Sequence, residues 1–556
     1  MRLAIVHGNT CFMQLLKQNQ DFSQARKLAC MSISDVANFL NISAHEVGCL
    51  ESGDCLPTAQ QVAALNFMSS FNQSKAVFSD RPANLDVSVP QTASRKGELA
   101  QFFTSQSICN FMTEMFNEPS RPVNLLDAGA GEGALSLAFV RRWATIAPIS
   151  GEAHEVDTII FENLQVALSA SSLGPHQIKA RKTDFIEWAA AELQHGNGKR
   201  FTHAILNPPY KKISSMSRHR SMLRSAGLET VNLYSGFVAL AVAMTMNNGE
   251  VVAIIPRSFC NGPYYIGFRK FILEKCAIEA IHIFERRDSA FSGDGVLQEN
   301  VIIKLRVGTK AGPVKISESC DESFEGSHER FVDFCEIVRP NDPDLFIHIP
   351  LGNSLDSAAM QKFDTSLSEL GIECSTGPVV DFRVNRHLSK ELKPTFVPLL
   401  YPQHFAGTKL EWPSLNQKKA NAIELCAATA KQLLPKGHYV VVRRFSSKEE
   451  QWRINPGIVD PLVLLGGYIG IENHLNYFHS GKKPLDRQLC WGLSAYLSST
   501  SVDSEFRKFS GHTQVNVTDL RKLLYPSMVK LMELGRCFME IGSIDRLRVD
   551  LYLENN

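Results

Sequence analysis

The chain has 556 residues, 44% of them hydrophobic, and a formal net charge of +1. That length predicts two to four domains with substantial cores, and a near-neutral chain can contact nucleic acid only through local clusters of Lys and Arg. The 13 cysteines form no Cys-x-x-Cys pair, which argues against a disulfide framework and against a metal site. No apolar run reaches the length of a membrane span and the first residues lack a signal-peptide pattern, so we expect a cytoplasmic protein that does not contact membranes.

Residues 1–75 are predicted to form a small helical domain. Apolar residues recur at helical spacing over 33–40, and Ser43 provides a cap before the next helical stretch. This pattern resembles the repressor-type (Cro/C1-like) helix-turn-helix family, which implies that the helix over 43–50 enters the major groove of DNA. The alternative is a helical packing module with no DNA role. A polar stretch rich in Ser, Pro and Asn predicts a linker over 76–95.

Residues 96–310 are predicted to form an α/β domain of the Rossmann-like type. Strand-like apolar runs alternate there with amphipathic helical stretches, which indicates a mostly parallel sheet covered by helices on both faces. The predicted strands are residues 123–127, 158–162, 178–182, 203–206, 251–256, 280–284 and 300–305. A stretch of mixed charge, Gly and Pro over 311–345 is expected to be a hinge, and 346–556 a separate α+β domain.

The first predicted strand ends in Asp127 and leads into a turn in which Gly129, Gly131 and Gly133 alternate with other residues. Glycines allow the backbone to approach a ligand closely at the carboxyl end of the first strand. A dinucleotide site would have the spacing G-x-G-x-x-G, whereas this turn has G-x-G-x-G. We therefore expect a cofactor without a pyrophosphate, with the Asp127 carboxylate near its amino-acid part. A plain tight turn is the alternative.

Further acidic residues after the predicted strands are candidates for cofactor contacts. Glu162 ends the second predicted strand, where a carboxylate can accept from both hydroxyls of a ribose, although Glu155 or Asp157 could fill the same role. After the third strand, Asp184 could accept from the adenine amine of the cofactor while Phe185 packs on its ring. A helix cap and a core aromatic are the alternative roles of these last two residues.

The fourth predicted strand ends in Asn207-Pro208-Pro209-Tyr210. Two successive prolines cannot continue a sheet because neither has an N–H, so they fix a rigid turn at the strand end where ligands of such sheets bind. The Asn207 side-chain oxygen and the Pro208 carbonyl can both accept from an –NH2 group and so orient its lone pair toward a methyl donor. Tyr210 offers an aromatic face for a planar base, which must be flipped out of a duplex to reach it. A structural Asn-Pro turn is the alternative.

The order of these motifs resembles the gamma class of N6-adenine DNA methyltransferases, TaqI-like enzymes of type II restriction-modification systems, and in particular the BsuBI/PstI type of modification methylase. Further matching segments lie at 97–104, 233–237, 249–259 and 291–301. The resemblance implies S-adenosyl-L-methionine as the cofactor, with Phe103 and Thr104 near its methionine part. It also implies an aromatic residue that stacks on the flipped adenine, for which Phe291 is the candidate. For Phe284, the runner-up, core packing is the expected role.

The long C-terminal region is predicted to recognise the DNA target. Arg suits guanine, and Asn or Gln suits adenine, in the major groove. Three clusters of such side chains have strand-like flanks, at 377–386, 439–445 and 509–516. The candidate DNA-binding residues are Arg383, Arg386, Arg443, Arg444, His512 and Gln514. For a single Arg a phosphate contact is expected more often than base readout, and surface loops with solvated charges are the alternative.

These features together predict an adenine-specific, site-specific DNA methyltransferase, the modification part of a restriction-modification system. The expected partners are double-stranded DNA, bound by a monomer, and a cognate restriction endonuclease encoded separately. Two other functions stay open. One is methylation of a protein glutamine or of RNA, because protein-glutamine enzymes also use Asn-Pro-Pro-Tyr. The other is a methyltransferase that also regulates transcription through its N-terminal residues.

Overall fold

The computed structural model describes His45, Val47 and Cys49 together with the ranges 104–171, 177–284, 299–324, 326–350, 363–414, 418–447, 449–511 and 513–555. Apart from those three residues, the predicted helix-turn-helix domain and linker lie outside the described part of the chain, as do Phe103, Phe291 and His512. Within the described ranges, no helix is both long and apolar enough to cross a membrane.

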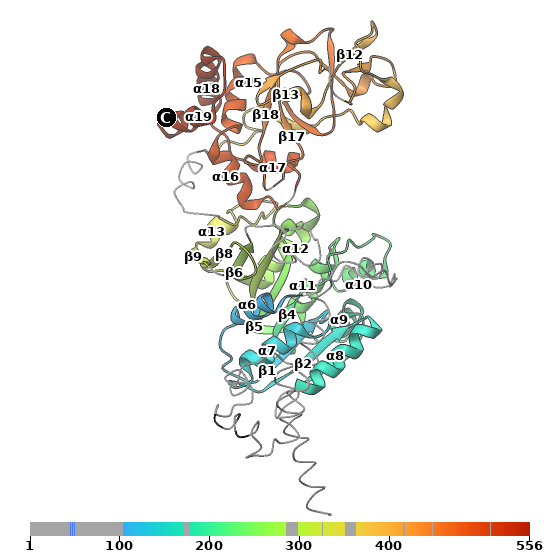
Figure 1. Cartoon of the computed structure of the whole chain (residues 1–556), viewed down its shortest axis with the longest axis vertical. Helices are drawn as coiled ribbons and strands as arrows, with labels where there is room; N and C mark the ends of the chain where they lie inside the picture. Colours follow the sequence, from blue (N-terminus) through green and yellow to red (C-terminus); the bar gives the residue numbers. More distant parts are fainter. Residues whose placement is uncertain are drawn as a thin grey trace, which may run out of the picture. The chain divides into compact units, whose positions relative to one another are not determined.

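A nine-stranded mixed sheet organises residues 123–332 (Figure 1). Its strands are β1 (Val123–Ala128), β2 (Ile149–Glu155), β3 (Gln177–Lys182), β4 (Phe201–Leu206), β5 (Thr245–Pro256), β6 (Cys276–Phe284), β7 (Asn300–Val307), β8 (Val314–Ser319) and β9 (His328–Val332). Their order across the sheet is β3-β2-β1-β4-β5-β7-β6-β8-β9. Strands β1 to β5 run parallel, and β7 runs antiparallel to both β5 and β6. The predicted α/β class is therefore confirmed.

The second strand of the sheet is not the segment that the sequence predicts. β2 spans Ile149–Glu155, whereas the predicted strand 158–162 falls in helix α8 (Thr158–Ser171). β2 lacks an apolar run, but it pairs in parallel with β1 and β3, and the buried His154 ring lies 2.8 Å from a threonine hydroxyl. Asp157 accepts from a backbone amide in the first turn of α8 at 2.9 Å. Strand pairing and helix capping thus outweigh side-chain hydropathy here.

Residues 311–345 are not a hinge in the structure. They include β8 and β9, which pair antiparallel with each other, and β8 also pairs with β6, so both strands extend the sheet. In β8, Val314 and Ile316 are buried on one face, and Ser317 and Ser319 are buried on the other, where they contact His282. A strand with buried residues on both faces does not show a regular alternation of apolar and polar residues. The hinge prediction is therefore wrong for 314–332, because the mixed charge and the nearby glycines gave no strand pattern.

Helices cover both faces of the sheet. They are α6 (Gln106–Glu114), α7 (Ala134–Trp143), α9 (Phe185–Gln194), α10 (Arg218–Ser225), α11 (Leu233–Met244) and α12 (Ile266–Lys275). Leu126, Ala204 and Val251 share one core with α9, α11 and α12. Because successive strand residues point to opposite faces, His203 of β4 lies on the other face, where its ring contacts Phe139 of α7. Helix α6 packs on α7 there.

The C-terminal region combines further sheets with a group of helices. Its strands are β10 (Glu373–Thr376), β11 (Leu388–Ser389), β12 (Phe396–Leu400), β13 (Phe405–Ala406), β14 (Lys409–Leu410), β15 (Ala422–Glu424), β16 (Leu433–Pro435), β17 (Tyr439–Arg443), β18 (Pro456–Val459), β19 (Tyr468–Ile471) and β20 (Leu475–His479). A four-stranded sheet has the order β10-β20-β17-β18, and a five-stranded sheet has the order β11-β15-β12-β19-β16. Strands β13 and β14 pair only with each other within the described residues.

Two of the C-terminal helices are in backbone contact. The helices of this region are α15 (Arg487–Leu497), α16 (Thr500–Phe509), α17 (Val517–Lys522), α18 (Met528–Ile541) and α19 (Arg546–Asn555), whereas the short α13 (Phe334–Ile337) packs on the core of the large sheet. Helices α15 and α18 lie side by side (Figure 1). A β-carbon on Gly492 would lie 1.8 Å from the Leu531 carbonyl oxygen, and one on Gly535 would lie 1.9 Å from that of Gln488. This approach therefore requires glycine at both positions.

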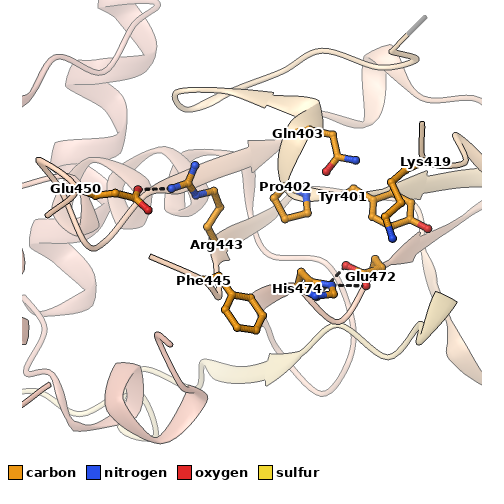
Figure 2. A pocket seen from close by; sticks show the side chains of 9 residues that line it. All are labelled: Tyr401, Pro402, Gln403, Lys419, Arg443, Phe445, Glu450, Glu472 and His474. Carbon is orange, nitrogen blue, oxygen red and sulfur yellow. Dashed lines mark hydrogen bonds and ion pairs between the residues drawn. The ribbon is translucent and has the colours of Figure 1, made fainter. Parts of the chain in front are cut away.

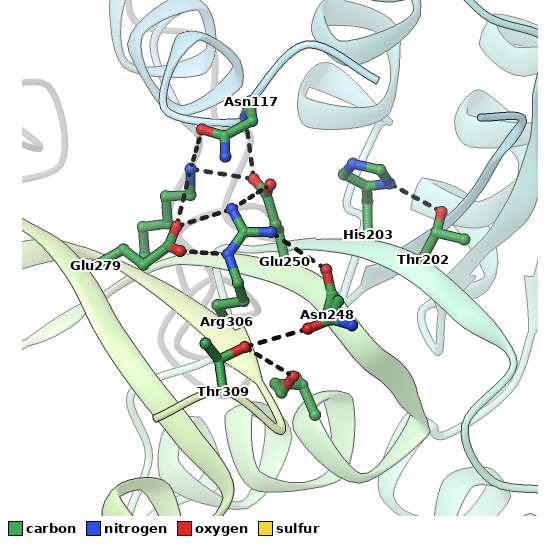
Figure 3. Close-up of polar contacts among 10 residues, drawn as sticks. Asn117, Thr202, His203, Asn248, Glu250, Glu279, Arg306 and Thr309 are labelled. Carbon is green, nitrogen blue, oxygen red and sulfur yellow. Dashed lines mark hydrogen bonds and ion pairs between the residues drawn. The ribbon is translucent and has the colours of Figure 1, made fainter. Parts of the chain in front are cut away.

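A buried network of charges joins three strands of the large sheet (Figure 3). Glu250 of β5 pairs with Lys304 at 3.2 Å and with Arg306 at 2.8 Å, both on β7. Both cations also pair with Glu279 of β6. Glu250 Oε2 further accepts from the backbone amide of Asn117 at 3.0 Å, which ties the segment after α6 to the sheet. Glu250 and Lys304 are each 4% exposed, so water cannot replace a lost partner.

We expect Glu250→Ala to destabilise the protein by about 3 kcal/mol, because it leaves the buried Lys304 ammonium with Glu279 as its one carboxylate. Urea unfolding of the purified chain measures the loss. Glu329→Ala is the matched control, since it removes the exposed partner of Lys315 and should change stability little. Equal losses in the two variants would contradict a special role for the buried network.

Candidate active site

Strand order reverses at the centre of the sheet. The chain passes from β1 to β2 and β3 on one side and continues with β4 and β5 on the other. Ligands of open α/β sheets bind at the carboxyl ends of the strands that flank such a reversal. The glycine turn follows β1 and Asn207 follows β4. A β-carbon on Gly129 would lie 3.9 Å from Pro209 Cδ and 3.3 Å from the Phe237 ring, so the two predicted motifs meet here.

The turn after β1 presents bare backbone. Gly129, Gly131 and Gly133 have φ values of 76°, 57° and 89°, which residues with a side chain rarely adopt. Gly133 is the N-cap of α7. No described atom lies within 4 Å of the position that a β-carbon on Gly131 would take. The predicted cofactor turn therefore has the conformation and the open space that a close-lying ligand needs.

Asp127 of β1 is a fully buried carboxyl group with one unsatisfied oxygen. Its Oδ2 accepts from the Ser136 hydroxyl at 2.6 Å and from the Ser136 amide at 3.2 Å. Its Oδ1 has no hydrogen-bond partner among the described residues. Burial raises the pKa of Asp127 to about 7. A buried acceptor without a partner costs about 1–3 kcal/mol, which a donor group of a bound ligand would offset.

Glu155, at the end of β2, holds the glycine turn in place. Its Oε2 accepts from the Gly131 amide at 3.1 Å, and its Oε1 accepts from the amides of Val156 and Asp157, both at 2.8 Å. Glu162 does not end a strand, because it lies in the second turn of α8. Glu155 therefore stands at the strand end where the sequence analysis expected Glu162. Glu155 is one of the two alternatives to Glu162 that the sequence left open.

Asp184 and Phe185 stand at the start of α9. Asp184 is the N-cap: its Oδ1 accepts from the Glu187 amide at 3.1 Å, and its Oδ2 lies 2.7 Å from His219 Nε2. Although burial opposes ionisation, the hydrogen bonds from His219 and the backbone hold the pKa of Asp184 below its ordinary value. Phe185 is 2% exposed, with its ring 5.2 Å from that of Phe237. The cap and core roles are thus present, and contact with a cofactor adenine stays a prediction.

Hydrogen bonds on both sides fix the side-chain amide of Asn207. Its Nδ2 donates to Thr104 Oγ1 at 2.9 Å. The Tyr210 hydroxyl lies 3.3 Å from Asn207 Oδ1 and 3.3 Å from the carbonyl oxygen of Ile254. Burial raises the pKa of Tyr210, so its hydroxyl stays protonated and donates. Because Nδ2 donates to Thr104, the other end of the amide is the acceptor Oδ1, which the Tyr210 hydroxyl approaches.

Two residues of the site were not predicted from the sequence. Ser136 bonds to the carboxyl group of Asp127, and His219 bonds to that of Asp184. A single Ser or His within a helix carries no pattern that reveals such a partner. Phe284, for which core packing was expected, is 3% exposed and its ring lies 4.9 Å from that of His282.

The predicted DNA-binding residues belong to the C-terminal sheets and their connections. Arg443 ends β17, and Arg444 follows it with its carbonyl accepting from the Val515 amide at 2.7 Å. Gln514 forms a backbone bridge with Phe445. The structure therefore brings two of the three predicted clusters together. Arg383 ends the short helix η5 (Asp381–Arg383), and Arg386 lies in η6 (Asn385–His387).

Comparison with known proteins gives matches over most of the chain. A family model described as Eco57I restriction-modification methylase matches residues 55–291. The Type II methyltransferase M.BsuBI of Bacillus subtilis is 47% identical over 476 residues, which are 83% of this chain and 94% of that protein. The Type II methyltransferase M.PstI of Providencia stuartii is 39% identical over 469 residues, 82% of this chain and 92% of that protein. Among solved structures, the Type IIL restriction-modification enzyme MmeI in complex with DNA aligns with a TM-score of 0.49 and 12% identity, over 90% of this chain and 76% of that chain.

The buried carboxyl of Asp127 generates a prediction about pH. Its pKa of about 7 stands above the ordinary 3.8, so the folded protein without ligand keeps a proton that the unfolded chain releases. Stability from this group is complete below about pH 4 and falls as pH rises to about 7, by up to ~1.4 kcal/mol per pH unit. Asp127→Asn should remove this dependence, whereas Asp364→Asn, at an exposed site, should not. Parallel melting profiles for wild type and Asp127→Asn between pH 4 and 7 would contradict a buried, titrating Asp127.

Proposed function

The chain belongs to the type II restriction-modification methyltransferases, and we propose that it transfers a methyl group from S-adenosyl-L-methionine to the N6 amine of an adenine in duplex DNA. DNA methylation within a restriction-modification system follows from the family. The proposal adds S-adenosyl-L-methionine as the methyl donor and the adenine amine as the group that is methylated. The observation that carries it is the Asn207 amide, held by Thr104 and Tyr210 where the strand order reverses.

The acceptor groups at the reversal fit this cofactor. S-adenosyl-L-methionine has an ammonium group, a ribose diol and an adenine amine, all of which donate hydrogen bonds. The unpartnered Oδ1 of Asp127 would accept from the ammonium group. Glu155, at the end of β2, would accept from the ribose, and Asp184 from the adenine amine. Thr104 would lie near the methionine part. The cofactor itself supplies a methyl group on a sulfonium sulfur, which is open to displacement.

The contribution of the chain to the transfer is to orient the amine. Asn207 Oδ1 and the Pro208 carbonyl would each accept from one N6 hydrogen, which turns the nitrogen lone pair toward the methyl group. Thr104 accepts from Asn207 Nδ2, so the amide oxygen rather than the nitrogen meets the substrate. Pro208 and Pro209 keep the turn rigid. After transfer the methylated nitrogen carries a positive charge and releases one proton to water, so a strong base is not required.

An adenine within a duplex cannot reach this turn, so we propose that the base is flipped out of the helix. Tyr210 would offer it an aromatic face, and Phe291 is the proposed stacking residue. The C-terminal region would select the target site. We further propose that the chain binds duplex DNA as a monomer and protects sites from a restriction endonuclease encoded separately.

Asn207→Ala should lower the rate of methyl transfer to DNA about 100-fold or more, because it removes an acceptor that acts on the reacting amine. The assay follows a radiolabelled methyl group from S-adenosyl-L-methionine into unmodified duplex DNA. Binding of the same DNA should be largely retained. Asn110→Ala, at an exposed position on α6, is the matched control and should keep full activity. Full activity of Asn207→Ala would sink the proposal.

Thr104→Val should lower kcat about tenfold, because it removes one hydrogen bond of about 1.4 kcal/mol that orients the Asn207 amide. Thr104→Ser keeps the hydroxyl and should restore most of the rate. The KM for DNA should not change, since Thr104 acts on the amide and not on the duplex. If Val and Ser variants have the same kcat, Thr104 does not orient Asn207.

A further inference from the structure

A pocket of about 450 Å³ lies in the C-terminal region, where β12, β17 and β19 end. Its wall includes Tyr401, Gln403, Lys419, Arg443, Glu472 and His474 (Figure 2). Aromatic, amide, basic and acidic side chains thus surround one space, so several hydrogen-bond donors and acceptors converge on it. None of these residues takes part in the catalytic site at β1 and β4. We call this space the C-terminal pocket.

Two nitrogen-bearing side chains of the C-terminal pocket, Arg443 and His474, already face carboxylates. Arg443 pairs with Glu450, and His474 Nδ1 lies 2.6 Å from Glu472 Oε1. The carboxylates are anchored in turn: Glu450 accepts from the Ser447 amide at 3.1 Å, and Glu472 accepts from the His474 amide at 2.9 Å. These contacts hold donors and acceptors in fixed directions and cancel most of the positive charge.

The lysine of the pocket is paired as well, since Lys419 Nζ lies 2.6 Å from Asp381 Oδ2. A phosphate oxygen only accepts hydrogen bonds, so cations without carboxylates beside them hold it best. The edges of base pairs in the major groove present acceptors and donors side by side, such as N7 and O6 of guanine and the amine of cytosine. Paired donors and acceptors therefore fit base edges better than they fit phosphates.

Two polar atoms of the wall are buried without a hydrogen-bond partner among the described residues, namely the Tyr401 hydroxyl and Arg443 Nε. Tyr401 is 2% exposed. An unsatisfied buried polar group costs about 1–3 kcal/mol. A ligand that bonds to these two atoms would offset that cost. The two atoms are therefore a second indication, independent of the charges, that the C-terminal pocket accommodates a polar ligand.

Two arginines beside the pocket differ from Arg443 in having no carboxylate partner among the described residues. Arg383 and Arg386 are exposed, and neither makes an ion pair within the described residues. Arg383 lies two residues after Asp381, the partner of Lys419, so the short helices that carry these arginines adjoin the pocket. Exposed, unpaired guanidinium groups are suited to bidentate phosphate contact.

We propose that the C-terminal pocket reads base edges of the target duplex, with Arg443 and the Glu472–His474 pair as reading groups, while Arg383 and Arg386 hold the flanking phosphates. This rests on the proposed function and names the groups that select the methylated site. For Arg443 it replaces the general expectation of a phosphate contact, because the guanidinium is paired with a carboxylate at the pocket wall.

The test measures binding of the full chain to DNA by fluorescence anisotropy. The target site is first located by sequencing modified bases in DNA from cells that express the wild type. Duplexes then carry that site or the site with one base pair changed, and Kd is measured over a series of salt concentrations. Arg443→Gln and His474→Ala are the reading variants, both at side chains with substantial exposure, and Arg383→Gln combined with Arg386→Gln is the matched phosphate variant.

The reading variants should lose discrimination at one or two base pairs by about tenfold or more, with an unchanged salt slope. The double phosphate variant should bind every duplex more weakly by the same factor, with a salt slope shallower by about 2. Full discrimination in both reading variants would overturn the assignment, as would a uniform loss with a shallower slope in Arg443→Gln. A wild type that binds all duplexes equally would instead contradict site-specific recognition by the chain, and with it the proposed function.

Discussion

The reversal of strand order between β1 and β4 is the constraint on which the site depends. Where the connections that follow two adjacent parallel strands turn to opposite sides of the sheet, a crevice opens at the strand ends. Here the backbone conformation restricts which residues can stand on each side of the crevice. Glycines with positive φ follow β1, and two successive prolines follow β4. A β-carbon on Gly129 would touch Pro209 and crowd the Phe237 ring, so the two turns meet at this glycine. The Asn207 amide is held by Thr104, which lies outside both turns, and by the Tyr210 hydroxyl.

Buried carboxyl groups give the crevice its electrostatic character. Asp127 is fully buried, and besides burial the charge of Glu155 contributes to its raised pKa. A cationic ligand would favour the ionised form of Asp127 and so lower that pKa. Ligand binding and protonation are therefore linked at this end of β1. Glu155 takes a structural part in the same arrangement, because it bonds to the Gly131 amide and so fixes the turn that a ligand would approach.

The parts of the site that could be predicted from the sequence are those in which the backbone itself restricts the residue type. Glycines with positive φ and a pair of prolines leave a pattern in the sequence, so Asp127, the turn and Asn207 were placed at the correct strand ends. β2 was misplaced because its stability comes from pairing with β1 and β3, and not from an apolar run. Because of that error, Glu162 rather than Glu155 was named first as the acidic residue at the end of the second strand.

Tertiary partners could not be predicted in this way. Thr104 meets Asn207 across 103 positions, and Glu250 meets the Asn117 amide across 133. The pairing of Lys419 with Asp381 in the C-terminal pocket likewise depends on how distant loops fold together. The sequence indicated that Arg443 belongs to a DNA-binding cluster, but its carboxylate partner, which changes the expected contact from phosphate to base, is visible only in the structure.

In the proposed function, the turn after β4 presents an adenine amine for methylation. Mass spectrometry of nucleosides tests it most directly, after duplex DNA has been incubated with the purified chain and S-adenosyl-L-methionine carrying a deuterated methyl group. We expect deuterated N6-methyldeoxyadenosine as the labelled product. A label found on cytosine, or in protein or RNA while the duplex stays unlabelled, would contradict it.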